Sequence, residues 1–136
     1  MHNLLAIAHL TDDAEARAQA ERTLGRFGPR AGRAARAIPM MLAALSAWHA
    51  GGMQIVIVGE GGPAAALGAE VARHYLPFAL AVPVLPGDRQ RAIAAQLPFV
   101  ESMRASAAAT AYVCRDFTCR EPVTTPEALA AQLSGR

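Results

Sequence analysis

Two cysteines near the end of the chain are the residues with the clearest chemical potential. Cys114 and Cys119 lie in the segment Tyr-Val-Cys-Arg-Asp-Phe-Thr-Cys, with four residues between them. A thioredoxin-type pair has two intervening residues at a helix N-terminus, where the helix dipole lowers the thiol pKa. This pair follows an expected strand instead. Three interpretations stay open: buried or reduced structural cysteines, which we favour; a regulatory disulfide; or metal ligands.

Other groups that could carry catalysis are scattered or missing. A zinc site needs four ligands, or three and a water, but His49 and His74 lie far from the cysteines in sequence. The chain has no G-x-S-x-G motif, no recognisable pair of acid/base carboxylates and no lysine, which excludes a P-loop or Schiff-base lysine. We therefore expect no catalytic residue, metal or cofactor, and no enzyme activity from this chain alone.

A glycine-rich turn is the second feature that could bind a ligand. Gly59, Gly61 and Gly62 follow an expected strand, open an expected helix and match G-x-G-x-x-A, a pattern that can hold phosphate at a helix N-terminus. However, Glu60 adds a negative charge there and Pro63 removes an amide donor. A tight turn explains the same glycines. A small nucleotide-binding or cysteine-redox domain is therefore our alternative hypothesis.

Charge and hydropathy exclude further classes. The formal net charge is +2, and the arginine series along residues 22–36 lacks interleaved aromatic residues, so we expect a solvated basic face and no nucleic acid. No apolar run reaches the ~20 residues of a membrane span, and no signal peptide is recognisable. We expect a cytoplasmic protein that binds no membrane.

The expected helices and strands divide the chain into two parts. Residues 1–52 are expected to be helical, with a helix over 14–27 that Asp12 and Glu15 cap and that Gly28 and Pro29 end. A further helix starts at Pro39 and ends at Gly51. Three helices joined by short loops predict the end of a helical-hairpin array.

Residues 53–136 predict a small α/β domain. We expect strands over 54–58, 78–85 and 111–114, the second at an edge because of Pro83. The intervening helices would begin at Pro63, which leads to Leu67, Val71 and Tyr75 on one face, and at a cap on Asp88. A last helix starts at Thr125. The alternation predicts a three-stranded, mainly parallel sheet with flanking helices.

Several segments together resemble one family. They are residues 3–11, 38–45 and 54–59, and most specifically the ending Tyr112-Val113-Cys114, Cys119 and Pro122-Val123-Thr124. In order and spacing they are similar to the C-terminal end of the YyaL / spermatogenesis-associated-protein-twenty family of thioredoxin-domain proteins.

The resemblance implies a place for the chain within a longer protein. The family is similar to a two-part design, a thioredoxin-like domain followed by a six-hairpin α/α toroid like that of some glycosidases. Residues 1–52 would be the remnant of the toroid and residues 53–136 an appended α/β domain. We therefore expect a non-catalytic C-terminal structural and interaction module. Its partners would be the thioredoxin-like and toroid parts of the same protein, or a second copy bound through the N-terminal helices.

Overall fold

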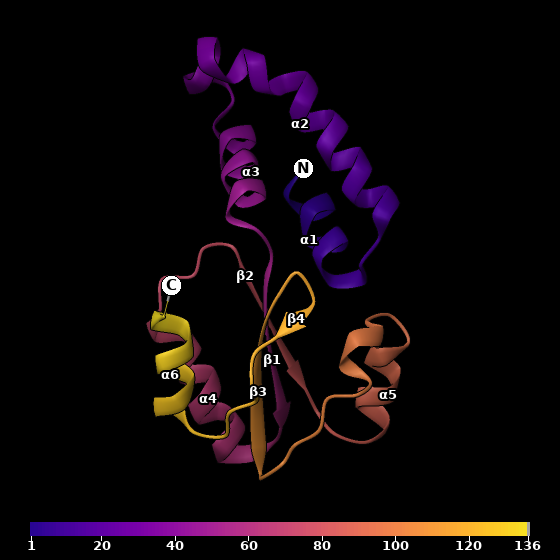
Figure 1. Cartoon of the computed structure of the whole chain (residues 1–136), viewed down its shortest axis with the longest axis vertical. Coiled ribbons are helices and arrows are strands. Elements are labelled where there is room, and N and C mark those ends of the chain that lie inside the picture. The colour runs from indigo at the N-terminus through magenta and orange to yellow at the C-terminus, as the bar shows by residue number, and fades with distance from the viewer. Residues whose placement is uncertain (136) are drawn as a thin grey trace. The chain divides into compact units, whose positions relative to one another are not determined.

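Two units make up the chain, and each is described by itself. A computed structural model describes residues 1–135 and divides the chain into Met1–Gly52 and Met53–Arg136 (Figure 1). The first unit is helical, and the second combines helices with a four-stranded sheet. The predicted α/β class is confirmed.

Three α-helices form the first unit: α1 (His2–Thr11), α2 (Ala14–Ala34) and α3 (Pro39–Ala50). A 3₁₀ turn, η1 (Ala35–Ala37), joins the last two. Pro39 occupies the first turn of α3, where its missing amide hydrogen costs no helical bond. A small cluster of buried side chains holds the helices together, with Trp48 packed against it.

The start and the end of α2 both differ from the prediction. Asp13, not Asp12, is the N-cap, since its carboxylate accepts hydrogen bonds from the amides of Glu15 and Ala16 at 2.8 and 3.0 Å. The predicted stop at Gly28 and Pro29 is wrong, because the helix continues to Ala34. Pro29 removes one helical amide donor, and the turn after it still buries Ala31.

The core of the first unit is thin. Among its described residues, Leu5 and Leu24 are the only buried apolar side chains larger than alanine; the others are Ala8, Ala16, Ala20, Ala31 and Ala44. Burying alanine removes little apolar area from water. Small domains are marginal even with full-sized core residues, so this unit gains little stability from its own core.

The sheet of the second unit has the strand order β2-β1-β3-β4. Its strands are β1 (Met53–Gly59), β2 (Ala79–Val84), β3 (Ala109–Arg115) and β4 (Thr118–Cys119). Strand β1 pairs with β2 in parallel, but β3 runs antiparallel to both β1 and β4. The prediction of three mainly parallel strands is therefore wrong. The loop before β3 brings Ala109, the first residue of β3, beside Gly59, the last residue of β1. From there β3 runs back along β1 in the antiparallel direction.

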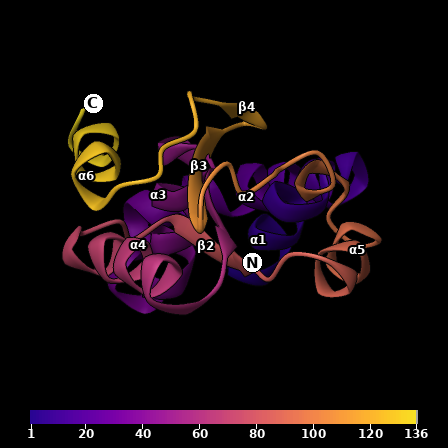
Figure 2. The same ribbon diagram turned by 90° about the horizontal axis from the view of Figure 1, so that it is seen from below.

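Both faces of the sheet are covered. Helices α4 (Gly61–Arg73) and α6 (Pro126–Ser134) lie on one side, whereas α5 (Asp88–Ala94) and the 3₁₀ turn η2 (Pro98–Val100) lie on the other (Figure 2). Alternate residues of β1 enter the two cores, so every residue of that strand is buried. Ile55 packs toward α4 and α6, and Val56 toward α5.

Some of the local sequence predictions for the second unit are confirmed, and others are wrong. Pro83 lies on β2, an edge strand as predicted. Thr125 caps α6, as its hydroxyl accepts a hydrogen bond from the Ala128 amide at 3.3 Å. Asp88 does not cap α5, because Gly87 is the N-cap and Asp88 is the first helical residue. Tyr75 lies beyond the end of α4 and is 91% exposed, so its predicted place on one helix face with Leu67 and Val71 is wrong.

Candidate functional site: a disulfide hairpin and an arginine-lined cavity

The two cysteines meet across a hairpin. Cys114 on β3 pairs directly with Cys119 on β4, their Cα atoms are 3.9 Å apart, and their sulfurs form a disulfide bond. The favoured interpretation of two reduced cysteines is therefore wrong for this structure. The sequence spacing alone could not show the pairing, which depends on the two-residue turn that sets the register of β3 against β4.

The two halves of the disulfide have different surroundings. Cys114 is 1% exposed and belongs to the core cluster that includes Val56, Val58 and Met103. Cys119 is exposed, on a strand of only two residues at the edge of the sheet. A reagent in solution therefore reaches the Cys119 end of the bond more readily than the Cys114 end.

The turn that joins the cysteines has an unusual backbone. Asp116 and Phe117 have φ values of 47° and 62°, in the left-handed region that glycine and asparagine usually occupy in such turns. A bulky residue such as Phe117 is strained there. Its ring meets Phe99 of η2 edge-on, with the ring centres 5.7 Å apart. The hairpin tip is thus fixed by the disulfide on one side and by an aromatic contact on the other.

The glycine-rich turn lies at the other end of the same strands. Gln54 pairs with Cys114, whereas Gly59 pairs with Ala109, five residues further along β1. That separation is roughly 17 Å at the rise of an extended strand. The two sets of predicted residues therefore do not form one site.

Packing accounts for part of this glycine pattern. A Cβ atom at Gly59 would lie 2.6 Å from the Cα of Ala109, so the close approach of β3 requires glycine. Gly61 has a φ of 68° and opens α4 with no neighbouring atom within 4 Å of a built Cβ, and Gly62 is equally open. Phosphate binding at Gly59, Gly61 and Gly62 stays a prediction.

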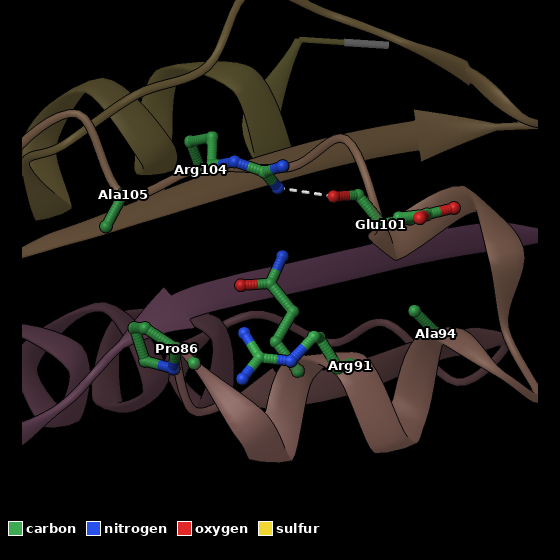
Figure 3. Close-up of a pocket in the computed structure, with 8 residues that line it drawn as sticks. Pro86, Arg91, Ala94, Glu101, Arg104 and Ala105 are labelled. Carbon is green, nitrogen blue, oxygen red and sulfur yellow. Dashed lines mark hydrogen bonds between the residues drawn. The ribbon is translucent and has the colours of Figure 1, made fainter.

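A cavity of about 460 Å³ lies beside α5 (Figure 3). Arg91 reaches it from α5 and Arg104 from the loop after η2, on facing walls. Pockets that bind small molecules commonly have 300–1,000 Å³. The residues that line this one are Pro86, Gly87, Gln90, Arg91, Ala94, Glu101, Arg104 and Ala105.

Hydrogen bonds hold the wall that carries Arg104. The Tyr112 hydroxyl donates to the Arg104 carbonyl at 2.6 Å and accepts from the Arg104 amide at 2.9 Å. The Arg104 guanidinium donates to the Glu101 and Met103 carbonyls. Buried Gln90 donates to the carbonyls of Val100 and Met103 at 2.8 and 2.6 Å. The loop wall is thereby tied to both β3 and α5.

The cavity has little net charge. Arg91 forms an ion pair with Asp88 one turn earlier, and the other wall carries the acidic Glu101 besides Arg104, which donates to the Glu101 backbone carbonyl (Figure 3). Both partners of the Arg91 pair are largely exposed, so solvent screens the attraction. The lining alone therefore does not specify a charged ligand.

The other predicted groups remain at the surface. Arg22, Arg26, Arg30, Arg33 and Arg36 are all exposed, and Arg30 stacks over the ring of Phe27 on the same helix at 5.7 Å. His74 hydrogen-bonds Glu70 at 3.0 Å, a contact within one helical segment. In residues 1–135, no group of three or more histidine, cysteine or acidic side chains is placed to hold a metal ion.

Sequence reasoning missed the residues that shape the cavity and the hairpin tip. Arg91 and Arg104 belong to no motif, and twelve residues lie between them along the chain. Phe99 and Phe117 likewise meet only through the fold. The one available signal was Gln90, three and four residues before the apolar Ile93 and Ala94 of α5 and so on their helix face, since a buried amide needs partners.

A comparison with known proteins confirms the predicted resemblance. The chain is 34% identical over 128 residues to the human protein Spermatogenesis-associated protein 20. The matched region is 92% of this chain but only 16% of the relative, so the chain spans about a sixth of that protein's length. This is consistent with a resemblance to a C-terminal region. No family model and no solved structure matches the chain. Among residues 1–135, no helix is long and apolar enough to cross a membrane.

Proposed function

We propose that this chain is a non-catalytic structural and interaction module of a longer, cytoplasmic, thioredoxin-domain protein. The helices of Met1–Gly52 would pack against further helices of the same polypeptide, as the last part of an α/α toroid. The α/β unit would be the appendage that follows. The observation that carries the proposal is the alanine-rich core of the helical unit, which is too thin to stabilise three helices by itself.

The surface of the helical unit supports the proposal. Met40 is 69% exposed and Ile7 is 47% exposed, although α1 and α3 are both apolar helices. An open cavity of about 360 Å³ lies between the start of α1 and the start of α3, lined by Met1, His2, Asn3, Met40 and Met41. Methionine-rich apolar surface of this kind is typical of contact with another helix.

The length of the relative favours the same polypeptide as the occupant. The human protein is about six times longer than the region that matches this chain, so most of its residues are available to cover such a surface. A second copy of this chain is the other occupant, and an experiment can distinguish them.

The test compares one exposed apolar residue in each unit. The isolated chain should bind an apolar dye such as ANS and should self-associate without a fixed stoichiometry on size-exclusion chromatography with light scattering. Met40→Glu should reduce both effects several-fold, because it places a charge on the uncovered surface. Tyr75→Glu is the matched control: Tyr75 is 91% exposed in the α/β unit, so its replacement should leave both effects unchanged.

Two results would overturn the proposal. A monomer that binds no dye would show that the helical unit needs no cover. A discrete dimer that Met40→Glu dissociates would assign the surface to a second copy of the chain.

A further inference from the structure

We infer that the Cys114–Cys119 disulfide is a reversible modification site for a dithiol partner, and that opening it frees residues 98–105, which carry one wall of the arginine-lined cavity. The inference concerns the α/β unit alone and does not rest on the proposed packing of the helical unit.

The different exposure of the two cysteine residues sets the direction of attack. A thiolate of the partner attacks Sγ of exposed Cys119, and the sulfur of buried Cys114 leaves with the bonding electron pair and takes up a proton. The second thiol of the partner then attacks the mixed disulfide and releases Cys119 as a thiol. The partner loses two electrons and two protons and gains a disulfide, while the hairpin gains two thiols.

The disulfide bond is not needed to hold β3 and β4 together. It closes a hairpin with only four residues between the cysteines, and short loops gain the least stability from a cross-link. Beyond the cysteines, the Arg120 amide donates to the Val113 carbonyl at 2.9 Å, and Ala111 and Val123 exchange two backbone hydrogen bonds. Opening the disulfide therefore releases the hairpin tip and leaves the sheet intact.

The turn supplies a reason for the tip to move. The directly opposed cysteines keep Asp116 and Phe117 in a two-residue turn with positive φ at both positions. Once the disulfide is open, the backbone pairing of β3 with β4 and the ring contact with Phe99 still hold this conformation, but no covalent bond does. The strain at Phe117 then favours a different turn, in which its ring no longer meets Phe99.

One contact connects this movement to the cavity. Phe99 lies in η2, directly before the Glu101–Arg104 wall, and loses its aromatic partner when Phe117 moves. Tyr112 lies on β3, which stays paired with β1, so its hydrogen bonds to the backbone of Arg104 remain. Residues 98–105 therefore depend on the oxidised hairpin for part of their support.

A reversible bond also agrees with the predicted compartment. The sequence predicts a cytoplasmic protein, and disulfides in reducing compartments are usually transient, catalytic or redox-sensing. A bond that is exposed at one end and dispensable for the fold has the properties of that class.

The first test maps the attack. The air-oxidised chain should contain no free thiol, and dithiothreitol should release two thiols without denaturant. Brief treatment with reduced glutathione should place the glutathionyl group on Cys119, as located by peptide mass spectrometry. A bond that opens only in denaturant, or a label on Cys114, would overturn the inference.

The second test measures the cavity wall by hydrogen exchange. Reduction should speed amide exchange in residues 98–105 by about tenfold, a size typical of local opening, and should leave residues 126–134 of α6 unchanged. Phe117→Ala should speed exchange in residues 98–105 of the oxidised chain. Unchanged exchange in residues 98–105 on reduction contradicts the coupling.

A control separates the disulfide from other effects of the reductant. The C114S/C119S chain should show the fast exchange of the wall from the start and should not respond to dithiothreitol. If that variant fails to fold, the reduced and alkylated wild-type chain serves the same purpose. A slow, unresponsive wall in either form would overturn the coupling.

Discussion

The backbone of Ala109 occupies the space that a side chain at Gly59 would need. A Cβ atom at Gly59 would lie 2.6 Å from the Cα and the Cβ of Ala109 and 2.7 Å from the carbonyl oxygen of Ala108. The φ of Gly59 is +147°, which side chains rarely tolerate. The first glycine of the G-x-G-x-x-A pattern is thus required by strand packing.

Gly59→Ala should therefore destabilise the α/β unit. We expect a loss of about 2–4 kcal/mol in the free energy of unfolding, measured by urea denaturation, because neighbouring backbone atoms must shift. Gly62→Ala is the control: it meets no atom within 4 Å and lies in a helix, so we expect a change below about 1 kcal/mol. A normally stable Gly59→Ala chain would show that packing does not explain this glycine.

Tyr112→Phe should weaken the wall of the arginine-lined cavity. The change removes a donor to the Arg104 carbonyl and an acceptor for the Arg104 amide. The expected loss is about 1–3 kcal/mol in urea denaturation, since both Arg104 groups lose a partner. Tyr75→Phe removes the hydroxyl of an exposed tyrosine and should be neutral. Equal effects of the two variants would contradict the role of the clamp.

The two units should differ in their ability to fold alone. Residues 53–136 contain a sheet buried on both faces, with large apolar residues such as Ile55, Leu67 and Leu129 in its cores. This fragment should keep its circular dichroism spectrum and unfold cooperatively. Residues 1–52 should be largely unfolded, because alanine dominates their core. A cooperatively folded 1–52 fragment would contradict the need for covering helices.

The two aspartates before α2 should differ in how much they stabilise that helix. Asp13→Ala should destabilise the helical unit by about 1 kcal/mol, since the amides of Glu15 and Ala16 lose their acceptor. Asp12→Asn should be close to neutral, because asparagine also tolerates the φ of 54° found at Asp12. Thermal melting of helicity at 222 nm measures both. The reverse ranking would restore the predicted cap at Asp12.

Strands and helix starts were the features that local sequence predicted best. The β-branched run after Gln54 can be buried only as a central strand, and Pro83 can be accommodated only where no partner needs its amide. Thr125 and Pro126 mark the start of α6 through capping chemistry that acts over four residues. Such signals involve near neighbours, so the sequence contains them in full.

Features that depend on distant residues were not predictable in this way. A strand buried on both faces has the same composition whether it is parallel or antiparallel, so the direction of β3 depended on the path of the preceding loop. Pro29 suggested a helix end, yet α2 continues to Ala34, and Ala31 in its last turns is buried. The disulfide and the cavity depend on register and on contacts between segments, such as Phe99 with Phe117, that no local pattern marks.

The mass of the native polypeptide shows whether this chain is part of a longer protein. An antibody raised against this chain should detect, in denaturing gels of cells that produce the protein, a band several times larger than 14.2 kDa. That result would place the chain inside a longer polypeptide whose other helices can cover Met40 and Ile7. A band at 14.2 kDa would contradict the account, because no further helices of the same polypeptide would then exist to pack against the first unit.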